Sequence, residues 1–391
     1  MSRKVAILGS TGSIGENTLR VIADHPDRFS VVALAGGANW KRMAKQAREF
    51  SPRIVSVADP SDADRLRGIL PGETTVLSGE EGLREVAAGA GADIVVSALV
   101  GAAGLVPTLE AIEAGAAIAL ANKEVLVMAG DLVKERSRAR GVPILPIDSE
   151  HAGVAQVLAG RSPDGEVRRV ILTASGGPFR TLPLESLPQV TPSEALRHPT
   201  WSMGPKVTID SASLMNKGLE LIEARWLFDL APEQVDVLIH PQSIVHALVE
   251  FIDGSLLAQM SVPDMRISIS QALSHPERIP CEASRLDLAQ VGSLHFDEPN
   301  LDRFPCLGHA RAALQEGGTA PAVLNAANEV AVAAYLDESA GFMDIPAVVG
   351  AALDAHGNGA ATELDLILEA DRWAREFAAS LLNGVRRKIR S

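Results

Sequence analysis

Short apolar runs alternate with amphipathic stretches over the first third of the chain. One stretch places Trp40, Met43, Ala44 and Ala47 at the i, i+3, i+4 and i+7 spacing of a helix with one buried face. Runs rich in β-branched residues predict strands at 5–8, 31–35, 54–57, 94–98, 116–120 and 142–147. Strands that alternate with helices form a parallel sheet covered on both faces, so residues 1–149 predict an α/β domain that binds ligands at the carboxyl ends of its strands.

The pattern changes near residue 150 and predicts a second, α+β domain over residues 150–275. Strands are expected at 167–173, 235–239, 244–251 and 255–260, and a helix at 212–228 follows an irregular, proline-rich stretch. Asp253-Gly254 between the last two strands is a hairpin signal. Residues 276–305 have weak periodicity and predict a linker. The Ala- and Leu-rich residues 306–391 predict a C-terminal helical domain.

Charge and cysteine content narrow the class of protein. The chain has 36 Lys and Arg against 49 Asp and Glu, a net charge of −13, which argues against general binding to nucleic acid or anionic membranes. The two cysteines, Cys281 and Cys306, form no metal-binding motif and are typical of a reducing compartment. The start of the chain has no secretory pattern, and the longest uncharged run, 94–109, is too short and broken to span a bilayer. We therefore expect a soluble, cytoplasmic protein.

A glycine-rich loop follows the first strand. In Gly9-Ser10-Thr11-Gly12-Ser13-Ile14-Gly15, Gly9 permits a tight turn, Gly12 lets a pyrophosphate approach the backbone, and Gly15 lets the next helix pack on the strand. The spacing differs from the commoner GxGxxG, and a purely structural turn is the alternative. The position between strand and helix favours a Rossmann-like dinucleotide-binding domain.

The end of the second strand indicates which nicotinamide cofactor binds. An NAD site usually carries an acidic residue there, against the ribose 2′-hydroxyl. Here residues 35–39 read Ala-Gly-Gly-Ala-Asn, and Lys41 and Arg42 follow. The missing carboxylate and the nearby cations favour a 2′-phosphate, hence NADPH. The alternative is that both cations are ordinary charges of a helix surface.

Asp148-Ser149-Glu150 follows the last strand of the first domain. In an extended chain, Asp148 and Glu150 point to the same side, and two converging carboxylates repel each other unless a cation lies between them. Ligands that are all oxygen favour a hard ion, Mg²⁺ or Mn²⁺. A helix N-cap with an acidic first turn explains the same residues equally well.

Two further polar sets are candidates for contacts to a phosphorylated substrate. Asn216, Lys217 and Glu220 share one helical face, and Ser211 lies near the expected helix start, where a hydroxyl and backbone N–H groups can hold a phosphate. A capped amphipathic helix with solvated charges is the alternative. Lys123, within Asn122-Lys123-Glu124 after a strand, either contacts a substrate oxygen or is a surface lysine.

These segments together resemble the 1-deoxy-D-xylulose 5-phosphate reductoisomerase family. The resemblance runs in order along nearly the whole chain and rests on segments 9–15, 120–124, 146–151, 173–179, 198–204, 211–220, 240–243, 262–266 and 325–329. It implies an N-terminal dinucleotide domain, a central catalytic domain that also forms a homodimer, and a C-terminal helical domain.

The resemblance also implies roles for individual residues. It implies that Asp148, Glu150 and Glu220 hold Mg²⁺ or Mn²⁺, with Co²⁺ as a further candidate. Lys123, Ser149 and Glu150 then face the reacting carbons, and residues 198–206 form a flap in which Trp201 covers the substrate. The implied phosphate ligands are Ser175, Ser211, Asn216 and Lys217, with His198 beside them. The implied NADPH contacts are Thr11, Gly12, Ser13, Ile14, Gly37, Asn39, Asn122, Glu124, Gly204 and Met265.

One departure concerns the cofactor site. Several family members carry a basic residue just before the position of Asn39, where this chain has Ala38. Recognition of the 2′-phosphate must then depend on Lys41, Arg42 or backbone N–H groups.

The implied reaction is a metal-assisted rearrangement of 1-deoxy-D-xylulose 5-phosphate, followed by reduction with NADPH to 2-C-methyl-D-erythritol 4-phosphate. A dehydrogenase of the homoserine or semialdehyde type and a non-catalytic NADPH sensor are the alternatives. The semialdehyde type needs a catalytic cysteine, and neither Cys281 nor Cys306 lies in a recognisable motif. The three separated acids and Lys123 argue against a homoserine-type dehydrogenase and against a sensor.

Overall fold

The computed structural model describes residues 2–160 and 165–389, with side chains up to residue 383. The chain forms two compact units. The N-terminal unit comprises residues 2–125, 133–152 and 264–283, and the C-terminal unit comprises the described residues of 126–132, 153–263 and 284–389. The predicted boundaries of three domains, at 149, 275 and 305, remain predictions, but the structure places residues 264–283 with the N-terminal unit.

A seven-stranded, wholly parallel sheet forms the centre of the N-terminal unit. Its strand order is β4-β3-β2-β1-β5-β6-β7. The strands are β1 (Arg3–Leu8), β2 (Phe29–Ala35), β3 (Ile54–Val57), β4 (Thr75–Ser78), β5 (Ile94–Ser97), β6 (Ala117–Leu120) and β7 (Ile144–Pro146). The six expected strands are all present. The edge strand β4 was missed, because only Val76 and Leu77 of its four residues are apolar.

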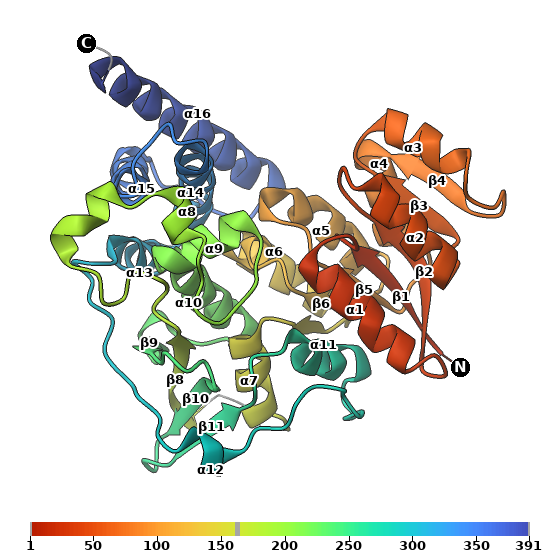
Figure 1. Ribbon diagram of the computed structural model, residues 1–391, viewed down its shortest axis with the longest axis horizontal. Coiled ribbons are helices and arrows are strands. Elements are labelled where there is room, and N and C mark those ends of the chain that lie inside the picture. The colour runs from red at the N-terminus through yellow and green to blue at the C-terminus, as the bar shows by residue number, and fades with distance from the viewer. Residues whose placement is uncertain (1, 161–164, 390–391) are drawn as a thin grey trace. The chain divides into compact units, whose positions relative to one another are not determined.

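Helices connect these strands and one more follows the last strand, and residues 126–132 and 153–157 of the last two helices group with the C-terminal unit. The helices are α1 (Ser13–Asp24), α2 (Trp40–Phe50), α3 (Pro60–Arg67), α4 (Gly79–Arg84), α5 (Leu105–Glu113), α6 (Glu124–Arg140) and α7 (Ser149–Val157), with the short π- and 3₁₀-helices η1 (Glu85–Gly89) and η2 (Gly101–Gly104). A later helix, α11 (Met265–Ser274), packs on α1, β6 and β7, and Figure 1 shows it beside α1. Its buried Ile269, Ala272 and Leu273 belong to the core of this unit, which explains why α11 does not group with the central segment.

The C-terminal unit contains a four-stranded sheet of order β11-β10-β8-β9. Its strands are β8 (Val167–Ala174), β9 (Val235–Ile239), β10 (Val245–Phe251) and β11 (Leu256–Met260). All four were expected within one residue of these bounds. β10 and β11 are antiparallel and joined at Asp253-Gly254, where Gly254 has φ +85°, so the predicted hairpin is confirmed.

Helices and irregular segments make up the rest of the C-terminal unit. The helices are η3 (Leu184–Gln189), α8 (Pro192–Ala195), α9 (Pro205–Ala212), α10 (Met215–Phe228), η4 (Pro232–Gln234), α12 (Leu288–Val291), α13 (Pro305–Glu316), α14 (Ala320–Leu336), α15 (Asp344–Ala355) and α16 (Leu364–Ile389). The expected single helix at 212–228 is wrong at its start. Leu214 adopts the left-handed conformation (φ +57°) and separates α9 from α10.

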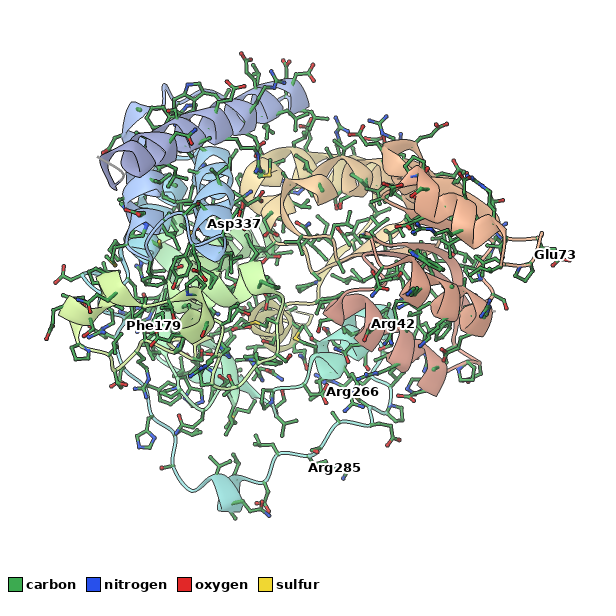
Figure 2. All side chains as sticks on the ribbon, turned by 45° about the horizontal axis from the view of Figure 1, so that its top comes forward. Arg42, Glu73, Phe179, Arg266, Arg285 and Asp337 are labelled. Atoms are coloured by element: carbon green, nitrogen blue, oxygen red, sulfur yellow. The ribbon has the colours of Figure 1, made fainter. Side chains whose placement is uncertain are left out.

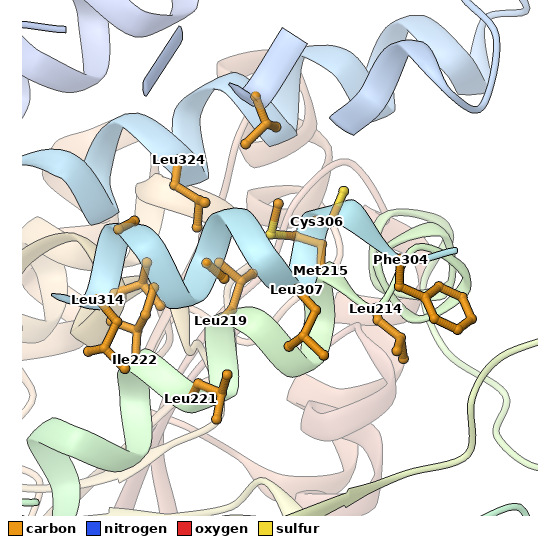
Figure 3. Close-up of a cluster of buried hydrophobic side chains, with 14 of the residues drawn as sticks. Leu214, Met215, Leu219, Leu221, Ile222, Phe304, Cys306, Leu307, Leu314 and Leu324 are labelled. Carbon is orange, nitrogen blue, oxygen red and sulfur yellow. The ribbon is translucent and has the colours of Figure 1, made fainter. Parts of the chain in front are cut away.

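Helices α10, α13 and α14 bury one continuous apolar cluster. Figure 3 shows Leu219 and Ile222 of α10 facing Leu307 and Leu314 of α13, with Leu324 of α14 beyond them. Close approach of α10 to α13 needs Gly218, because a Cβ there would lie 2.5 Å from the Cβ of Ala310. The cluster fixes α10, which carries several candidate site residues, on the C-terminal helices. Within the described residues, no helix combines the length and the apolar character needed to cross a membrane.

Candidate active site

The loop between β1 and α1 has the geometry expected of a dinucleotide site. Gly9 has φ +92°, and a Cβ on it would lie 2.3 Å from the carbonyl oxygen of Ala98. A Cβ on Gly15 would lie 2.4 Å from the Cα of Ser10, so this glycine permits close packing of helix on loop. Gly12 is the N-cap of α1, and no side chain caps that helix end. Its Cβ position meets only Gly9 oxygen, at 3.4 Å, which leaves room for a ligand to approach the backbone.

A buried residue that the sequence analysis missed holds this loop in place. The side chain of Gln46 on α2 donates to the Ser10 carbonyl oxygen (2.8 Å) and accepts from the Ser10 hydroxyl (2.9 Å). Both residues are fully or almost fully buried. The available signal was a glutamine beside the apolar positions Met43 and Ala47, because buried polar side chains are normally hydrogen-bonded.

The segment after β2 presents open backbone and one exposed cation. No atom lies within 4 Å of the Cβ position of Gly37. Asn39 is the N-cap of α2, and its side chain accepts from the Arg42 N–H (3.1 Å). The Arg42 guanidinium pairs with Glu16 of α1 at 2.8 Å, and Figure 2 labels this arginine. Lys41 is exposed, with its ammonium 5.8 Å from the Trp40 ring centre. Among the described residues, Arg42 is therefore paired with a carboxylate, whereas Lys41 is not.

Three further candidate cofactor residues also lie in the N-terminal unit. Asn122 is buried, and its side chain donates to the carbonyl oxygens of Leu99 (2.6 Å) and Gly101 (3.0 Å) and accepts from the Val125 N–H. The side chain thus ties the loops after β5 and β6 together. Glu124 is the first residue of α6 and is buried, and Met265 is the first residue of α11.

Lys123 is not a surface lysine. It follows β6, is 8% exposed, and places its ammonium 2.6 Å from the carboxylate of Asp148, which follows β7. Both residues lie at the carboxyl edge of the parallel sheet, where ligands of such folds bind. The structure therefore excludes the surface interpretation and brings two candidate site residues together.

The structure corrects the expected geometry of Asp148-Ser149-Glu150. The carbonyl oxygen of Asp148 accepts the first helical hydrogen bond, from the Ala152 N–H (2.8 Å), and Ser149 and Glu150 begin α7. The expected extended geometry is therefore wrong, but the expected convergence is confirmed, because carboxylate oxygens of Asp148 and Glu150 lie within 4.8 Å of each other. Their carboxylates lie at a helix N-terminus, where the helix dipole stabilises negative charge. The Ser149 hydroxyl donates to the Glu150 carboxylate.

In the C-terminal unit, α10 carries three candidate residues that are joined by hydrogen bonds to the carboxylate of one of them, Glu220. The Asn216 side-chain amide and the Lys217 ammonium both donate to the Glu220 carboxylate. Lys217 and Glu220 are 3% and 1% exposed, so the alternative of solvated surface charges is wrong. Glu223, one turn further along, is fully buried as well.

His198 and Ser175 form a second group in this unit. The Nδ1 atom of His198 accepts from the backbone N–H groups of Thr200 (3.2 Å) and Trp201 (2.9 Å). In the neutral ring the proton therefore sits on Nε2, which lies 3.1 Å from the Ser175 hydroxyl. Burial lowers the pKa of His198 to about 4, so the imidazole is neutral at physiological pH.

Ser211 lies at the end of α9 rather than at the start of α10. The expected support from the N-terminus of its own helix is therefore wrong, and the left-handed Leu214 is the reason. Gly177 brings the Ser175 loop against this helix end, because a Cβ on Gly177 would lie 2.9 Å from the Ser211 carbonyl oxygen. Ser175 and Ser211 thus belong to adjoining segments. The partly buried Trp201 and the exposed Gly204 lie in the irregular segment that precedes α9.

Three family models match this chain. A model of 1-deoxy-D-xylulose 5-phosphate reductoisomerase covers residues 5–130, and two models of the C-terminal domain of the same enzyme cover residues 144–228 and 260–377. The reductoisomerase of Prosthecochloris aestuarii is 54% identical over 381 residues, which are 97% of this chain and 99% of the relative. That of Chlorobaculum tepidum is 54% identical over 97% of this chain and 100% of its own length.

The chain belongs to the 1-deoxy-D-xylulose 5-phosphate reductoisomerase family.

Solved reductoisomerase structures share this fold over almost the whole chain. The enzyme from Zymomonas mobilis in complex with NADPH has a TM-score of 0.91 and 43% identity, covering 98% of this chain and 99% of its own. A reductoisomerase in complex with NADPH, fosmidomycin and magnesium has a TM-score of 0.94 and 43% identity, with the same coverage. The predicted reductoisomerase family and the predicted fold class are therefore confirmed, and a homoserine- or semialdehyde-type dehydrogenase is excluded.

Proposed function

We propose that this chain catalyses the NADPH-dependent conversion of 1-deoxy-D-xylulose 5-phosphate to 2-C-methyl-D-erythritol 4-phosphate with a bound divalent metal ion. The observation that carries the proposal is family membership over 97% of the chain, joined to buried ion pairs that place Lys123 on Asp148 and Lys217 on Glu220. Buried charges cost free energy unless they are paired, so burial of these four groups at candidate positions favours a functional role.

Asp148, Glu150 and Glu220 are the residues that we propose as metal ligands. All three offer only carboxylate oxygen, the donor that Mg²⁺ and Mn²⁺ prefer, and Co²⁺ is a further candidate. Bound Mg²⁺ or Mn²⁺ polarises the oxygens of the substrate and stabilises the negative charge that develops during rearrangement. Asn216 and Lys217 hold the Glu220 carboxylate in one orientation, and the N-terminus of α7 favours the charge of Glu150.

The substrate phosphate is the group that we assign to Ser175, Ser211, Asn216 and Lys217, with His198 beside them. The contact of Gly177 with the end of α9 supports the pairing of the two serine segments. Since His198 is neutral, its Nε2 proton can be donated to Ser175 or to an oxygen of the phosphate. Trp201, whose backbone is fixed by the same imidazole, covers the substrate and excludes water.

The remaining catalytic roles fall to Lys123 and Ser149. The Lys123 ammonium is a hydrogen-bond donor for a substrate oxygen and offsets the charge of Asp148. NADPH supplies the hydride for the reduction step. Its pyrophosphate fits the uncapped N-terminus of α1 at Thr11, Gly12, Ser13 and Ile14, since Gly12 leaves the backbone open. The further proposed cofactor contacts are Gly37, Asn39, Asn122, Glu124, Gly204 and Met265.

A second copy of the chain is the partner that we propose for β11. This strand lies at one edge of its sheet, with Leu256 50% and Leu257 41% exposed, and Ile252 before it is 70% exposed. The opposite edge, β9, is covered in part by Asp297, which exchanges two backbone hydrogen bonds with Ile239. An exposed apolar edge strand favours pairing with another chain, and two-fold pairing closes the assembly as a homodimer. Sedimentation should give a dimer for the native protein and a monomer for Leu257→Lys.

A cytoplasmic location is a further proposal, which the reduced thiols of Cys281 and Cys306 support. The proposed activity itself is tested by identifying the product. Turnover of 1-deoxy-D-xylulose 5-phosphate with deuterated NADPH should give 2-C-methyl-D-erythritol 4-phosphate carrying one deuterium on carbon. A product without the label, or an unrearranged carbon skeleton, would contradict the proposed reaction.

A further inference from the structure

A buried hydrogen bond links α9 to the C-terminal helices. The carboxylate of Asp210, immediately before Ser211, is 1% exposed. Its Oδ1 accepts from the side-chain amide of Asn328 on α14 at 2.8 Å, although the two residues are far apart in sequence. Its Oδ2 pairs with the ammonium of Lys206, one turn earlier on α9, at 2.9 Å. Both oxygens of this buried carboxylate are therefore bound.

Two titratable side chains, those of Lys206 and Cys306, lie near the buried carboxylate of Asp210. Cys306 of α13 lies close enough that the negative charge of Asp210, together with burial, raises the pKa of its thiol to about 12. The thiol is thus protonated, and Lys206 supplies the positive charge. Removal of a hydrogen-bond donor here would leave the carboxylate under-satisfied in a dry environment.

Among the described residues, the side-chain amide of Asn328 makes one hydrogen bond, to Asp210. Asn328 is fully buried, and within the described part of the chain its Oδ1 atom has no hydrogen-bond partner. An apolar side chain would avoid the cost of that buried oxygen but would leave Asp210 Oδ1 without its donor, so the asparagine at this position serves the contact with Asp210. The amide is explained if the position of Asp210, and with it the end of α9, must be set accurately.

Ion pairs and a hydrogen bond hold helix α14 in place, so α14 can in turn fix the position of α9. Glu329, next to Asn328, pairs with Arg375 of α16 at 2.7 Å, and Arg375 also pairs with Asp371 at 2.7 Å. Asn325, one turn before Asn328, donates to Glu329 at 2.9 Å. The segment 325–329 therefore binds α16 on one side and α9 on the other.

We propose that Asn328 is a positioning residue for the substrate phosphate, acting through Asp210 to fix the end of α9 and so the Ser211 hydroxyl. The inference rests on the proposed function, because it takes Ser211 to be a phosphate ligand. It gives the segment 325–329, which contributes no residue to the proposed site, a role in substrate binding from a distance. Small displacements of a binding group lower affinity strongly, so the effect is measurable.

The test compares two equally buried asparagines on the same helix. Asn328→Leu should raise the KM for 1-deoxy-D-xylulose 5-phosphate and the inhibition constant of inorganic phosphate about tenfold, with kcat and the KM for NADPH changed much less. Asn325→Leu is the matched control, since Asn325 is also fully buried with an unpartnered Oδ1 among the described residues, yet bonds to Glu329. It should change both phosphate-dependent constants much less than Asn328→Leu does, because the amide of Asn325 bonds to Glu329 and not to Asp210. Equal changes in the two variants, or none in Asn328→Leu, would overturn the proposal.

A second variant keeps the test decisive if Asn328→Leu does not fold. Asn328→Asp has the same shape but places two carboxylates together, which repel when both are charged and share a proton when one is neutral. Lys206 and the protonated Cys306 thiol are the other titratable groups around Asp210. The KM for substrate should therefore be raised at about pH 8 and should recover toward the native value at about pH 6, as the shared proton restores the link. A ratio of variant to native KM that is the same at both pH values would contradict the inference.

The variant Ser211→Ala distinguishes a failure of the positioning role of Asn328 from a failure of the phosphate assignment of Ser211. If Ser211→Ala raises the KM for substrate and the Asn328 variants do not, the positioning role fails and the phosphate assignment stands. If Ser211→Ala leaves both phosphate-dependent constants unchanged, the phosphate assignment itself is wrong, and the role of Asn328 fails with it.

Discussion

The ammonium of Lys123 lies 2.6 Å from the carboxylate of Asp148, and both side chains are largely buried at the carboxyl edge of the parallel sheet. Each residue lies in the loop after one of two neighbouring strands, Lys123 after β6 and Asp148 after β7. The sheet therefore sets the geometry of a lysine and an acid that the sequence separates by a whole helix.

Lys123→Ala should lower kcat by about a hundredfold, because it removes a buried cation that faces developing negative charge. The KM for NADPH should change little. Lys45→Ala is the control, since Lys45 is an exposed lysine of the same unit. Steady-state measurement of kcat for both variants tests this prediction. An unchanged kcat for Lys123→Ala would mean that the lysine only neutralises Asp148.

Two acids on α10 should differ in their effect on metal affinity. Glu220→Gln should weaken Mg²⁺ binding by about a hundredfold or more and cut turnover with it, because it removes a ligand charge that Asn216 and Lys217 orient. Glu223→Gln should retain more of the affinity, since Glu223 is not among the proposed ligands. Calorimetric metal titrations of both variants provide the measurement. Loss of the metal from Glu223→Gln but not from Glu220→Gln would mean that Glu223, and not Glu220, is the metal ligand.

His198 should remain neutral across the working pH range. Its folded-state pKa of about 4 lies below the ordinary value of 6.5, so the unfolded chain binds the additional proton between these values. The contribution of His198 to stability is then complete above pH 6.5 and is lost as the pH falls toward 4. Nuclear magnetic resonance titration of the imidazole, assigned with His198→Gln, should give a pKa below 5. A midpoint near 6.5 would contradict the neutral Nε2 donor described above.

The cofactor preference should depend on Lys41 more than on Arg42. Lys41→Ala should lower the preference for NADPH over NADH in kcat/KM about tenfold, through loss of a charge-assisted contact to the 2′-phosphate. Arg42→Ala should have a smaller effect, since Glu16 already pairs with that guanidinium. Arg48→Ala, on the exposed face of the same helix, is the control. Equal kcat/KM of the native protein for NADPH and NADH would refute the interpretation of the β2 end.

Sequence patterns predicted most of the fold because strands and helices of both sheets repeat their apolar residues regularly. The misses have physical causes. The edge strand β4 has only two apolar residues and follows the turn at Pro71-Gly72, so periodicity cannot detect it. The break between α9 and α10 occurs at a leucine with φ +57°, and nothing about a leucine predicts a left-handed conformation that tertiary packing imposes.

Sequence motifs predicted which residues are candidates for the site, but they did not predict which of these residues contact one another. The motifs named Lys123, Asp148 and Glu220 as candidates, and local spacing placed Glu220 on one helical face with Asn216 and Lys217 without predicting which acid Lys217 contacts. The contact of Lys123 with Asp148 depends on the order of strands in the sheet, and that of Asn328 with Asp210 on packing between helices. Neither follows from a local pattern. The same reason hid Gln46, whose partner Ser10 lies on a different element.

The most direct test of the account is the rate of NADPH oxidation by chelator-treated protein under four conditions: alone, with 1-deoxy-D-xylulose 5-phosphate, with Mg²⁺ or Mn²⁺, and with both. We expect oxidation only when substrate and metal are present together, since the proposed reaction needs a metal ion bound with the substrate. Oxidation without added metal in a fully stripped sample would contradict the metal-assisted mechanism. No oxidation with both present, while NADPH still binds, would identify a sensor rather than an enzyme.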